Sequence, residues 1–247
     1  MTAREVIEIK DDVFSSDYYI DEALNTLRTN IQLSGRHVKS IMVTSTLSDE
    51  GKSHISLYLA RKLAQIGKKV VYVEADLRKP TQFVIQGAVG EIPGMTHFLN
   101  GQVDVSQILH TTTDENLYVI TSGTIAVNPS ELLEDELFGD MMNWLEQNSD
   151  YVIVDTPPIG VVIDAAIIAK SVDSAIFVVE SGETSYHLAR KALGQLTKTG
   201  CRVLGAVLNK VDVKGGKYYG KYYGKYYGKY YGDYYKNSSK AKSGDKG

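Results

Sequence analysis

Short apolar runs alternate with longer amphipathic stretches along the first two hundred residues of the chain. Runs without polar alternation, such as residues 151–154 and 175–179, suit strands that are buried on both faces of a sheet. We predict strands at 40–44, 69–73, 117–121, 151–154, 174–179 and 202–208, and helices at 52–65, 129–147, 163–170 and 185–199. This order predicts an α/β fold, with a mainly parallel β-sheet flanked by helices on both faces and ligands at the carboxyl ends of its strands.

A further helix is expected ahead of the first of these strands, at about 17–34. Apolar residues recur there at helical spacing, at Ile20, Leu24, Leu27 and Ile31. Because the helix precedes the sheet, we expect it to face a neighbouring subunit.

The C-terminal stretch has a different pattern. The unit Lys-Tyr-Tyr-Gly runs four times through residues 217–232, and ten of the 17 tyrosines of the chain lie in residues 217–235. A period of four fits neither a strand nor a helix stripe, and glycine disfavours helix, so we predict disorder. The sequence therefore divides into a folded domain at 1–213 and a tail at 214–247, which is either a spacer or an array of phosphorylation sites.

Charge separates the same two parts. Nine lysines and two aspartates from Lys214 onward give the tail +7, which leaves −10 on residues 1–213 of a chain whose total is −3. An acidic body lacks the clustered basic face that nucleic acids require, so we expect no nucleic-acid partner. A single cysteine, Cys201, excludes an internal disulfide and indicates a reducing cytoplasm. No apolar run approaches the ~20 residues that span a bilayer, so any membrane association is expected to come through a partner.

Residues 40–53 read as a strand, a loop and the start of a helix that carries Gly51, Lys52 and Ser53. This is the context of a phosphate-binding P-loop, in which backbone amides hold phosphate oxygens, the lysine neutralises phosphate charge and the hydroxyl ligates Mg²⁺. The match is imperfect, because Thr46 stands at the position of the first glycine of the motif.

Carboxylates follow two of the predicted strands. Glu74 and Asp76 come just after the strand predicted at 69–73, and Asp155 comes just after the strand predicted at 151–154. Carboxyl ends of parallel strands meet at the ligand edge of such a sheet, where a metal ion neutralises an acidic cluster. Alternation of strand side chains predicts that Glu74 and Asp76 point the same way and act on one site.

Together, the loop at 50–53, the stretch at 74–80, the stretch at 155–158, the stretch at 128–133 and the tyrosine-rich terminus resemble the bacterial tyrosine kinases of the capsule and exopolysaccharide type. The resemblance covers nearly the whole chain and implies a P-loop fold that uses ATP and Mg²⁺. It implies phosphate charge neutralisation by Lys52, Mg²⁺ held by Ser53, Asp76 and Asp155, and Glu74 as the residue that orients or deprotonates a phenol. The implied nucleotide-binding residues are Ser48, Asp49, Glu50, Gly51, Lys52, Ser53, His54 and Asn209.

Four residues depart from the family pattern. Ser48 and Asp49 stand where proline and glycine are usual, His54 where threonine is usual, and Glu74 where aspartate is usual. Asp49 adds a negative charge near the phosphates, so we expect weaker nucleotide binding. Glu74 keeps the charge but moves the carboxylate by about one methylene.

The resemblance also implies an assembly and partners. Glu22, Asn25 and Arg28 occupy the places of a family helix pattern that joins subunits into a ring. The implied partners are a transmembrane activator of the polysaccharide co-polymerase type, which recruits the kinase to the inner face of the plasma membrane, and a cognate tyrosine phosphatase. The implied autophosphorylation sites are Tyr218, Tyr219, Tyr222, Tyr223, Tyr226, Tyr227, Tyr230, Tyr231, Tyr234 and Tyr235.

Two other functions fit parts of the sequence. An ATPase switch of the partitioning or cell-division-site type would share the sheet and the carboxylates, but it carries an extra loop lysine where Leu47 stands. A GTPase is suggested by Asn209 to Asp212, although the Leu-Asn-Lys segment of the kinase family accounts for the same residues.

Overall fold

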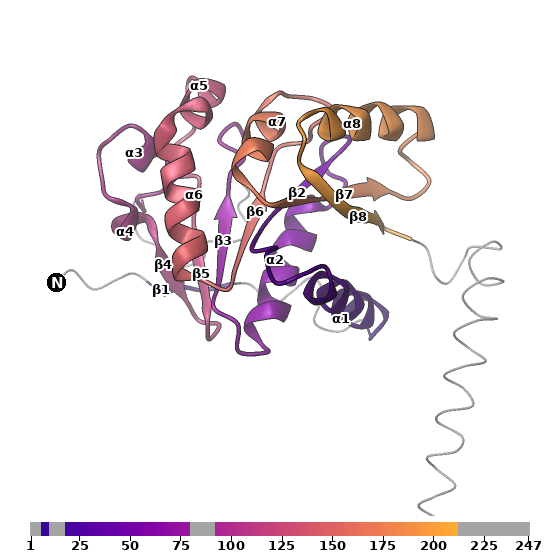
Figure 1. The fold of residues 1–247 in the computed structure, drawn as a ribbon, viewed down its shortest axis with the longest axis horizontal. Coiled ribbons are helices and arrows are strands. Elements are labelled where there is room, and N and C mark those ends of the chain that lie inside the picture. Colours follow the sequence, from indigo (N-terminus) through magenta and orange to yellow (C-terminus); the bar gives the residue numbers. More distant parts are fainter. Residues whose placement is uncertain (1–5, 10–17, 80–91, 212–247) are drawn as a thin grey trace, which may run out of the picture. The chain divides into compact units, whose positions relative to one another are not determined.

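The computed structural model describes residues 6–9, 18–79 and 92–211 (Figure 1). Eight strands of this part form one sheet in the order β1-β4-β5-β3-β6-β2-β7-β8, parallel except for the antiparallel pair β4 and β5. The strands are β1 (Val6–Ile7), β2 (Ser40–Ser45), β3 (Val70–Glu74), β4 (His110–Thr112), β5 (Leu117–Ile120), β6 (Tyr151–Asp155), β7 (Ser174–Glu180) and β8 (Arg202–Asn209). The predicted mainly parallel α/β fold is confirmed.

Helices cover both faces of the sheet (Figure 1). One face carries α1 (Tyr18–Leu33) and α2 (Lys52–Ala64); the other carries α3 (Met95–Leu99), α4 (Val105–Ile108), α5 (Pro129–Glu134), α6 (Glu136–Asn148), α7 (Asp164–Ile168) and α8 (Tyr186–Lys198). Successive strand residues point to opposite faces. Ile41 and Val43 therefore pack under α2, whereas Met42 belongs to the core under the other helices.

The single helix predicted at 129–147 is wrong, because it is two helices that meet at Asp135. Asp135 has an extended backbone (φ −65°, ψ 146°), and its Oδ1 accepts a hydrogen bond from the Leu137 amide at 2.9 Å. A side chain that caps a new helix in this way ends the previous one. The predicted helix at 163–170 likewise finishes as a 3-10 turn, Ala169–Ser171.

Four short elements were not predicted, namely β1, β4, α3 and α4. Each has five residues or fewer, which is too short for a periodic pattern. None of the described helices is both long and apolar enough to cross a membrane. The predicted domain boundary at 213 and the tail at 214–247 lie outside the described residues.

Strand order determines which loops meet. β6 lies between β2 and β3, so Asp155 at its end is in register with Val43 of β2 on one side and Glu74 of β3 on the other. The carboxylates after β3 and β6 therefore share one edge with the loop after β2.

Candidate active site

The loop between β2 and α2 has the backbone of a tight turn. Asp49 and Gly51 both have positive φ, at 65° and 90°. A Cβ on Gly51 would lie 2.1 Å from Nδ2 of Asn209, so only glycine fits there. Leu47, Ser48 and Asp49 are exposed at the tip of the loop.

Glu50 holds this loop from within. Its side chain is buried, with Oε2 accepting a hydrogen bond from the Leu47 amide at 2.8 Å. Its Oε1 accepts from the Glu180 amide at 3.3 Å and from the Thr184 hydroxyl. The carboxylate of Glu50 thus shapes the loop and joins it to the loop after β7.

Asn209 reaches the same loop from the end of β8. Its Nδ2 donates a hydrogen bond to the backbone oxygen of Glu50 at 2.8 Å. The side-chain amide of this predicted nucleotide-binding residue is therefore used to fix the phosphate loop beside Gly51.

Lys52 and Ser53 open α2, and both are largely buried. The Lys52 Nζ donates to the Ser53 Oγ at 3.3 Å and lies 4.0 Å from the Asp76 Oδ2. Ammonium, hydroxyl and carboxylate therefore gather at the start of one helix, where the helix dipole also favours anions. His54, the third residue of α2, is half-buried.

The turn after β3 orients Asp76. Its Oδ1 accepts hydrogen bonds from the amides of Arg78 (3.2 Å) and Lys79 (3.0 Å), which leaves Oδ2 facing Lys52. The Lys79 ammonium extends from this turn to 3.8 Å from the Asp49 Oδ1, and both side chains are exposed. A lysine thus lies beside the unusual aspartate of the phosphate loop, but as a solvent-exposed pair it changes the charge there little.

A bidentate ion pair fixes the same turn to the helices beyond. The Nε and Nη2 atoms of Arg78 donate to the fully buried carboxylate of Asp164 at 2.6 and 2.9 Å, and Nη2 also donates to the Ser130 hydroxyl at 3.0 Å. Ser130 donates in turn to Asp164 at 2.8 Å. The stretch at 128–133 that carried the family resemblance therefore supports the turn that holds Asp76.

Asp155 is the most buried of the candidate metal ligands, with no exposed surface. Burial raises its pKa to about 6, against the opposing effects of the Lys52 charge and the Ser53 hydroxyl; the charges of Glu74 and Asp76 raise it further. Its Oδ2 accepts a hydrogen bond from the Tyr72 hydroxyl at 3.3 Å, whereas its Oδ1 is buried without a hydrogen-bond partner. A buried carboxylate oxygen that lacks a hydrogen-bond partner is suited to binding a cation.

Magnesium suits this donor set. No group of three or more histidine, cysteine, aspartate or glutamate side chains in the described residues could hold a metal ion. Mg²⁺ is usually bound through one or two protein oxygens, with water and substrate phosphates as the other ligands. The Asp155 Oδ1 and the nearby Ser53 hydroxyl fit that pattern.

Glu74 is held by the strand on its other side. Its Oε2 accepts hydrogen bonds from both the amide (3.1 Å) and the hydroxyl (2.9 Å) of Ser122, which follows β5. Glu74 is buried and in register with Asp155. The side chain of Glu74, which is longer than the usual aspartate of the family, is therefore held in place by Ser122.

Sequence reasoning missed several residues of this region. Ser122, Tyr72 and Asp164 act through contacts between distant elements, and no local signal marks them. Gly160 is a further case, because a Cβ there would lie 2.2 Å from the backbone oxygen of Thr46. Gly160 follows the two prolines of the stretch at 155–158, and this sequence feature could have predicted that the segment forms a loop packed against the phosphate loop.

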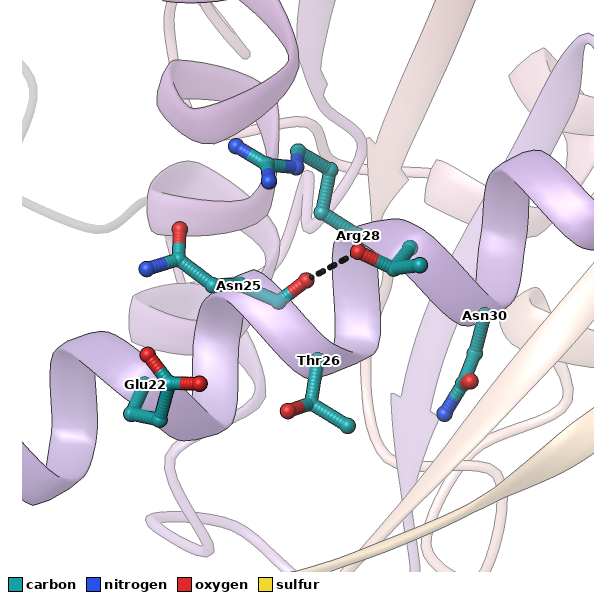
Figure 2. A pocket seen from close by; sticks show the side chains of 6 residues that line it. Glu22, Asn25, Thr26, Arg28 and Asn30 are labelled. Atoms are coloured by element: carbon teal, nitrogen blue, oxygen red, sulfur yellow. Dashed lines mark hydrogen bonds between the residues drawn. The ribbon is translucent and has the colours of Figure 1, made fainter. Parts of the chain in front are cut away.

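The predicted assembly residues lie apart, on α1. Glu22, Asn25 and Arg28 line an open pocket of about 510 Å³ that is formed by α1 side chains alone (Figure 2). The Nε of Arg28 is buried without a hydrogen-bond partner, and Asn25 donates to Asp21 at 3.1 Å. The predicted autophosphorylation sites, Tyr218 to Tyr235, lie outside the described residues.

A loop with a positive-φ glycine lies between a buried strand and a helix, a lysine stands at the helix start, and carboxylates lie at or just after the ends of β3 and β6. These features define a P-loop nucleotide-binding protein. The family described as "AAA domain" matches residues 38–210. Tyrosine-protein kinase CpsD of Streptococcus pneumoniae is 44% identical over 198 residues, which cover 80% of this chain and 87% of that protein.

Solved structures agree with these matches. The chimerical protein CapA2B2 has a TM-score of 0.74 at 30% identity, over 84% of this chain and 95% of its own. The kinase domain of the Escherichia coli tyrosine kinase ETK has a TM-score of 0.75 at 30% identity, over 80% and 78%. The chain belongs to the capsular-type bacterial tyrosine kinases and is a protein-tyrosine kinase.

The rival class shares the fold alone. The septum site-determining protein MinD of Pyrococcus horikoshii, solved in complex with Mg-ADP, has a TM-score of 0.60 at 21% identity, over 72% of each chain.

Proposed function

We propose that the chain transfers phosphate from ATP to tyrosine hydroxyls of its own tail and of other proteins, with Mg²⁺ bound at Asp155. The observation that carries the proposal is the fully buried Asp155, whose Oδ1 has no hydrogen-bond partner and which lies beside the start of α2. A buried carboxylate oxygen without a hydrogen-bond partner destabilises the folded protein, and a bound cation would remove that cost.

The charged groups of the site match the needs of phosphoryl transfer, in which positioning and electrostatic stabilisation supply most of the rate. Lys52 provides positive charge for the β and γ phosphates from the start of α2. Ser53 would ligate Mg²⁺ directly, and Asp76 and Asp155 would bind it through water. When bound, Mg²⁺ would neutralise part of the phosphate charge.

Glu74 is the candidate to receive or orient the phenol proton. Because the phenol pKa is near 10, the proton is transferred as the phosphoryl group leaves rather than before. The two hydrogen bonds from Ser122 fix one carboxylate oxygen of Glu74 and hence the direction of the group.

Residues 48–54 and Asn209 would also bind the nucleotide. The loop would contribute the backbone amides of Ser48, Asp49, Glu50 and Gly51, and the helix would contribute its first residues up to His54. The hydrogen bond from Asn209 to the loop supports this role. The same bond offers an account of Asn209 that does not involve guanine recognition.

Family membership supports a proposal on assembly, partners and location. We propose that α1 joins copies of the chain into a ring through Glu22, Asn25 and Arg28, and that a transmembrane activator of the polysaccharide co-polymerase type recruits the kinase to the inner face of the membrane. A cognate phosphatase would reverse the modification. In this setting the kinase would regulate capsular or exopolysaccharide synthesis and export.

The test of the activity is phosphate transfer by the purified chain. Wild-type protein incubated with labelled ATP and Mg²⁺, with and without the cytoplasmic segment of a candidate activator, should label Tyr218 to Tyr235. Lys52→Met should abolish the label while the far-ultraviolet circular dichroism spectrum is kept, and Lys62→Met, at the other end of α2, serves as the control. Wild-type labelling by Lys52→Met would overturn the proposal. A chain that hydrolyses ATP without labelling any tyrosine would favour the partitioning-type switch.

A further inference from the structure

β3 carries a tyrosine among valines. Val70, Val71 and Val73 are the branched residues expected of a buried strand, but Tyr72 places a phenol in the core with no exposed surface. A buried hydroxyl without a hydrogen bond destabilises the folded protein. The position of the Tyr72 hydroxyl therefore needs an explanation beyond packing.

The hydroxyl lies at the candidate metal site. Tyr72 is in register with Ile153, and both come two residues before the paired residues Glu74 and Asp155. Because strand side chains alternate between faces, the Tyr72 side chain lies on the same face of the sheet as those of Glu74 and Asp155. Its hydroxyl donates to the Asp155 Oδ2 at 3.3 Å. A phenol is protonated at neutral pH, so the carboxylate is the acceptor in this bond.

This bond makes the two oxygens of Asp155 unequal. Oδ2 is occupied by Tyr72, whereas Oδ1 is buried and has no hydrogen-bond partner. The terminal torsion of an aspartate is broad and roughly two-fold, so an unanchored carboxylate would spread its oxygens over many directions. An anchor on one oxygen fixes where the other one points.

We propose that Tyr72 is a positioning residue for the magnesium site, which holds Asp155 so that Oδ1 faces the metal ion or its water. This inference rests on the proposed function, because it requires Asp155 to serve that site. It predicts that the phenol matters for Mg²⁺ and not for the nucleotide alone.

Packing gives the competing explanation, in which the ring fills the core and Asp155 merely satisfies the hydroxyl. Phenylalanine would fill the same volume, so Tyr72→Phe separates the two. Tyr151→Phe is the matched control, because Tyr151 is on β6, on the same face as Asp155 and four residues before it, at the opposite end of the strand.

The experiment measures binding of fluorescent mant-ADP to the full chain as Mg²⁺ is raised. For Tyr72→Phe we expect the half-maximal Mg²⁺ concentration to rise about three- to tenfold, as for the loss of one ordinary hydrogen bond, with unchanged binding in EDTA. Tyr151→Phe should match the wild type. Tyr72→Leu, which also removes the ring, provides a second variant, and thermal melts show which variants are folded.

Asp155→Asn separates this inference from the proposed function. If Asp155→Asn leaves the Mg²⁺ dependence unchanged, the metal site itself is wrongly assigned. If it raises the half-maximal concentration but a folded Tyr72→Phe matches the wild type, only the role of Tyr72 is overturned. Tyr72→Phe should add no shift in the Asp155→Asn background, and an equal shift there would show that Tyr72 does not act through Asp155.

Discussion

Ser122 donates two hydrogen bonds to one oxygen of Glu74, from its amide at 3.1 Å and from its hydroxyl at 2.9 Å. Both residues are buried, and they come from the ends of neighbouring strands, β5 and β3. The glutamate that replaces the usual aspartate of the family is thus matched by a hydroxyl that receives its longer side chain.

If Glu74 handles the phenol proton, loss of this hydroxyl should slow the chemistry. We expect Ser122→Ala to lower kcat about tenfold with little change in the KM for ATP, since a hydrogen bond to a charged group is worth about 1.5 kcal/mol. Ser122→Thr should retain activity. In a Glu74→Asp background, whose shorter side chain does not reach Ser122, the alanine change should have no effect. Steady-state kinetics on a tyrosine peptide provide the measurement, and equal losses in both backgrounds would contradict the link.

Asp155→Asn should stabilise the metal-free protein while impairing Mg²⁺-dependent function. Burial raises the pKa of Asp155 from 3.8 to about 6. The contribution of the protonated Asp155 side chain to the free energy of unfolding is therefore full below pH 4 and is lost as the pH rises through 6. Above pH 6 the charged form costs about 3 kcal/mol, and asparagine avoids that cost. Melts in EDTA should show a gain of several degrees at pH 7.5 that shrinks by pH 4.5. An equal difference at both pH values would show that the charge of Asp155 is not its cause.

Asp49→Gly should tighten nucleotide binding. The substitution removes a negative charge from the phosphate loop and relieves a residue whose φ is 65°, a conformation that glycine adopts freely. Asp49→Asn removes the charge but keeps a side chain, so it separates the two causes. We expect both to lower the Kd of mant-ATP severalfold at low salt and less at high salt, because exposed charges are screened. The variant Asp104→Asn, at the N-cap of α4 outside the site, should leave the Kd unchanged.

Asn25→Arg should strengthen self-association if α1 forms the ring contact. Asn25 lines the α1 pocket between Glu22 and Arg28, at the place of a family arginine (Figure 2). Light scattering on a Lys52→Met background, which removes effects of phosphorylation, should show a larger mass at equal concentration. Asn148→Arg, at the end of α6, is the control for added charge. A strictly monomeric species at high concentration in both α1 forms would argue against the ring.

Transfer between subunits is tested by mixing two chains. A Lys52→Met chain with an intact tail is combined with an active chain that lacks residues 217–235, and the tail of the inactive chain should be labelled. Each phosphotyrosine adds about −1.5 to −2, so four or five modifications cancel the +7 of the tail and should loosen the assembly. An unlabelled tail beside phosphorylated exogenous substrate excludes transfer between subunits. A labelled tail with unchanged assembly size excludes the charge switch.

The sequence by itself determined the fold class, the strands that bear the site and the chemistry of its main residues. Apolar runs alternate with amphipathic stretches, and this pattern predicts the strands and helices of an α/β fold. Lys52, Asp76 and Asp155 stand in short sequence motifs at strand ends and at a helix start, and those motifs indicate their chemistry. The sequence did not predict short elements such as β4 or the helix break at Asp135, because these depend on pairing with another strand and on helix capping.

The tertiary structure alone decided how each carboxylate is held. Glu74 is fixed by Ser122, Asp155 by Tyr72, and Asp76 by its own turn, which the Arg78 and Asp164 ion pair supports from another helix. These partners lie 48 to 86 residues apart along the chain, except within the turn of Asp76. Glu74 meets Ser122, and Asp155 meets Tyr72, because β3 pairs with β5 on one side and with β6 on the other. Strand order of that kind is set by packing of the whole sheet rather than by any local pattern.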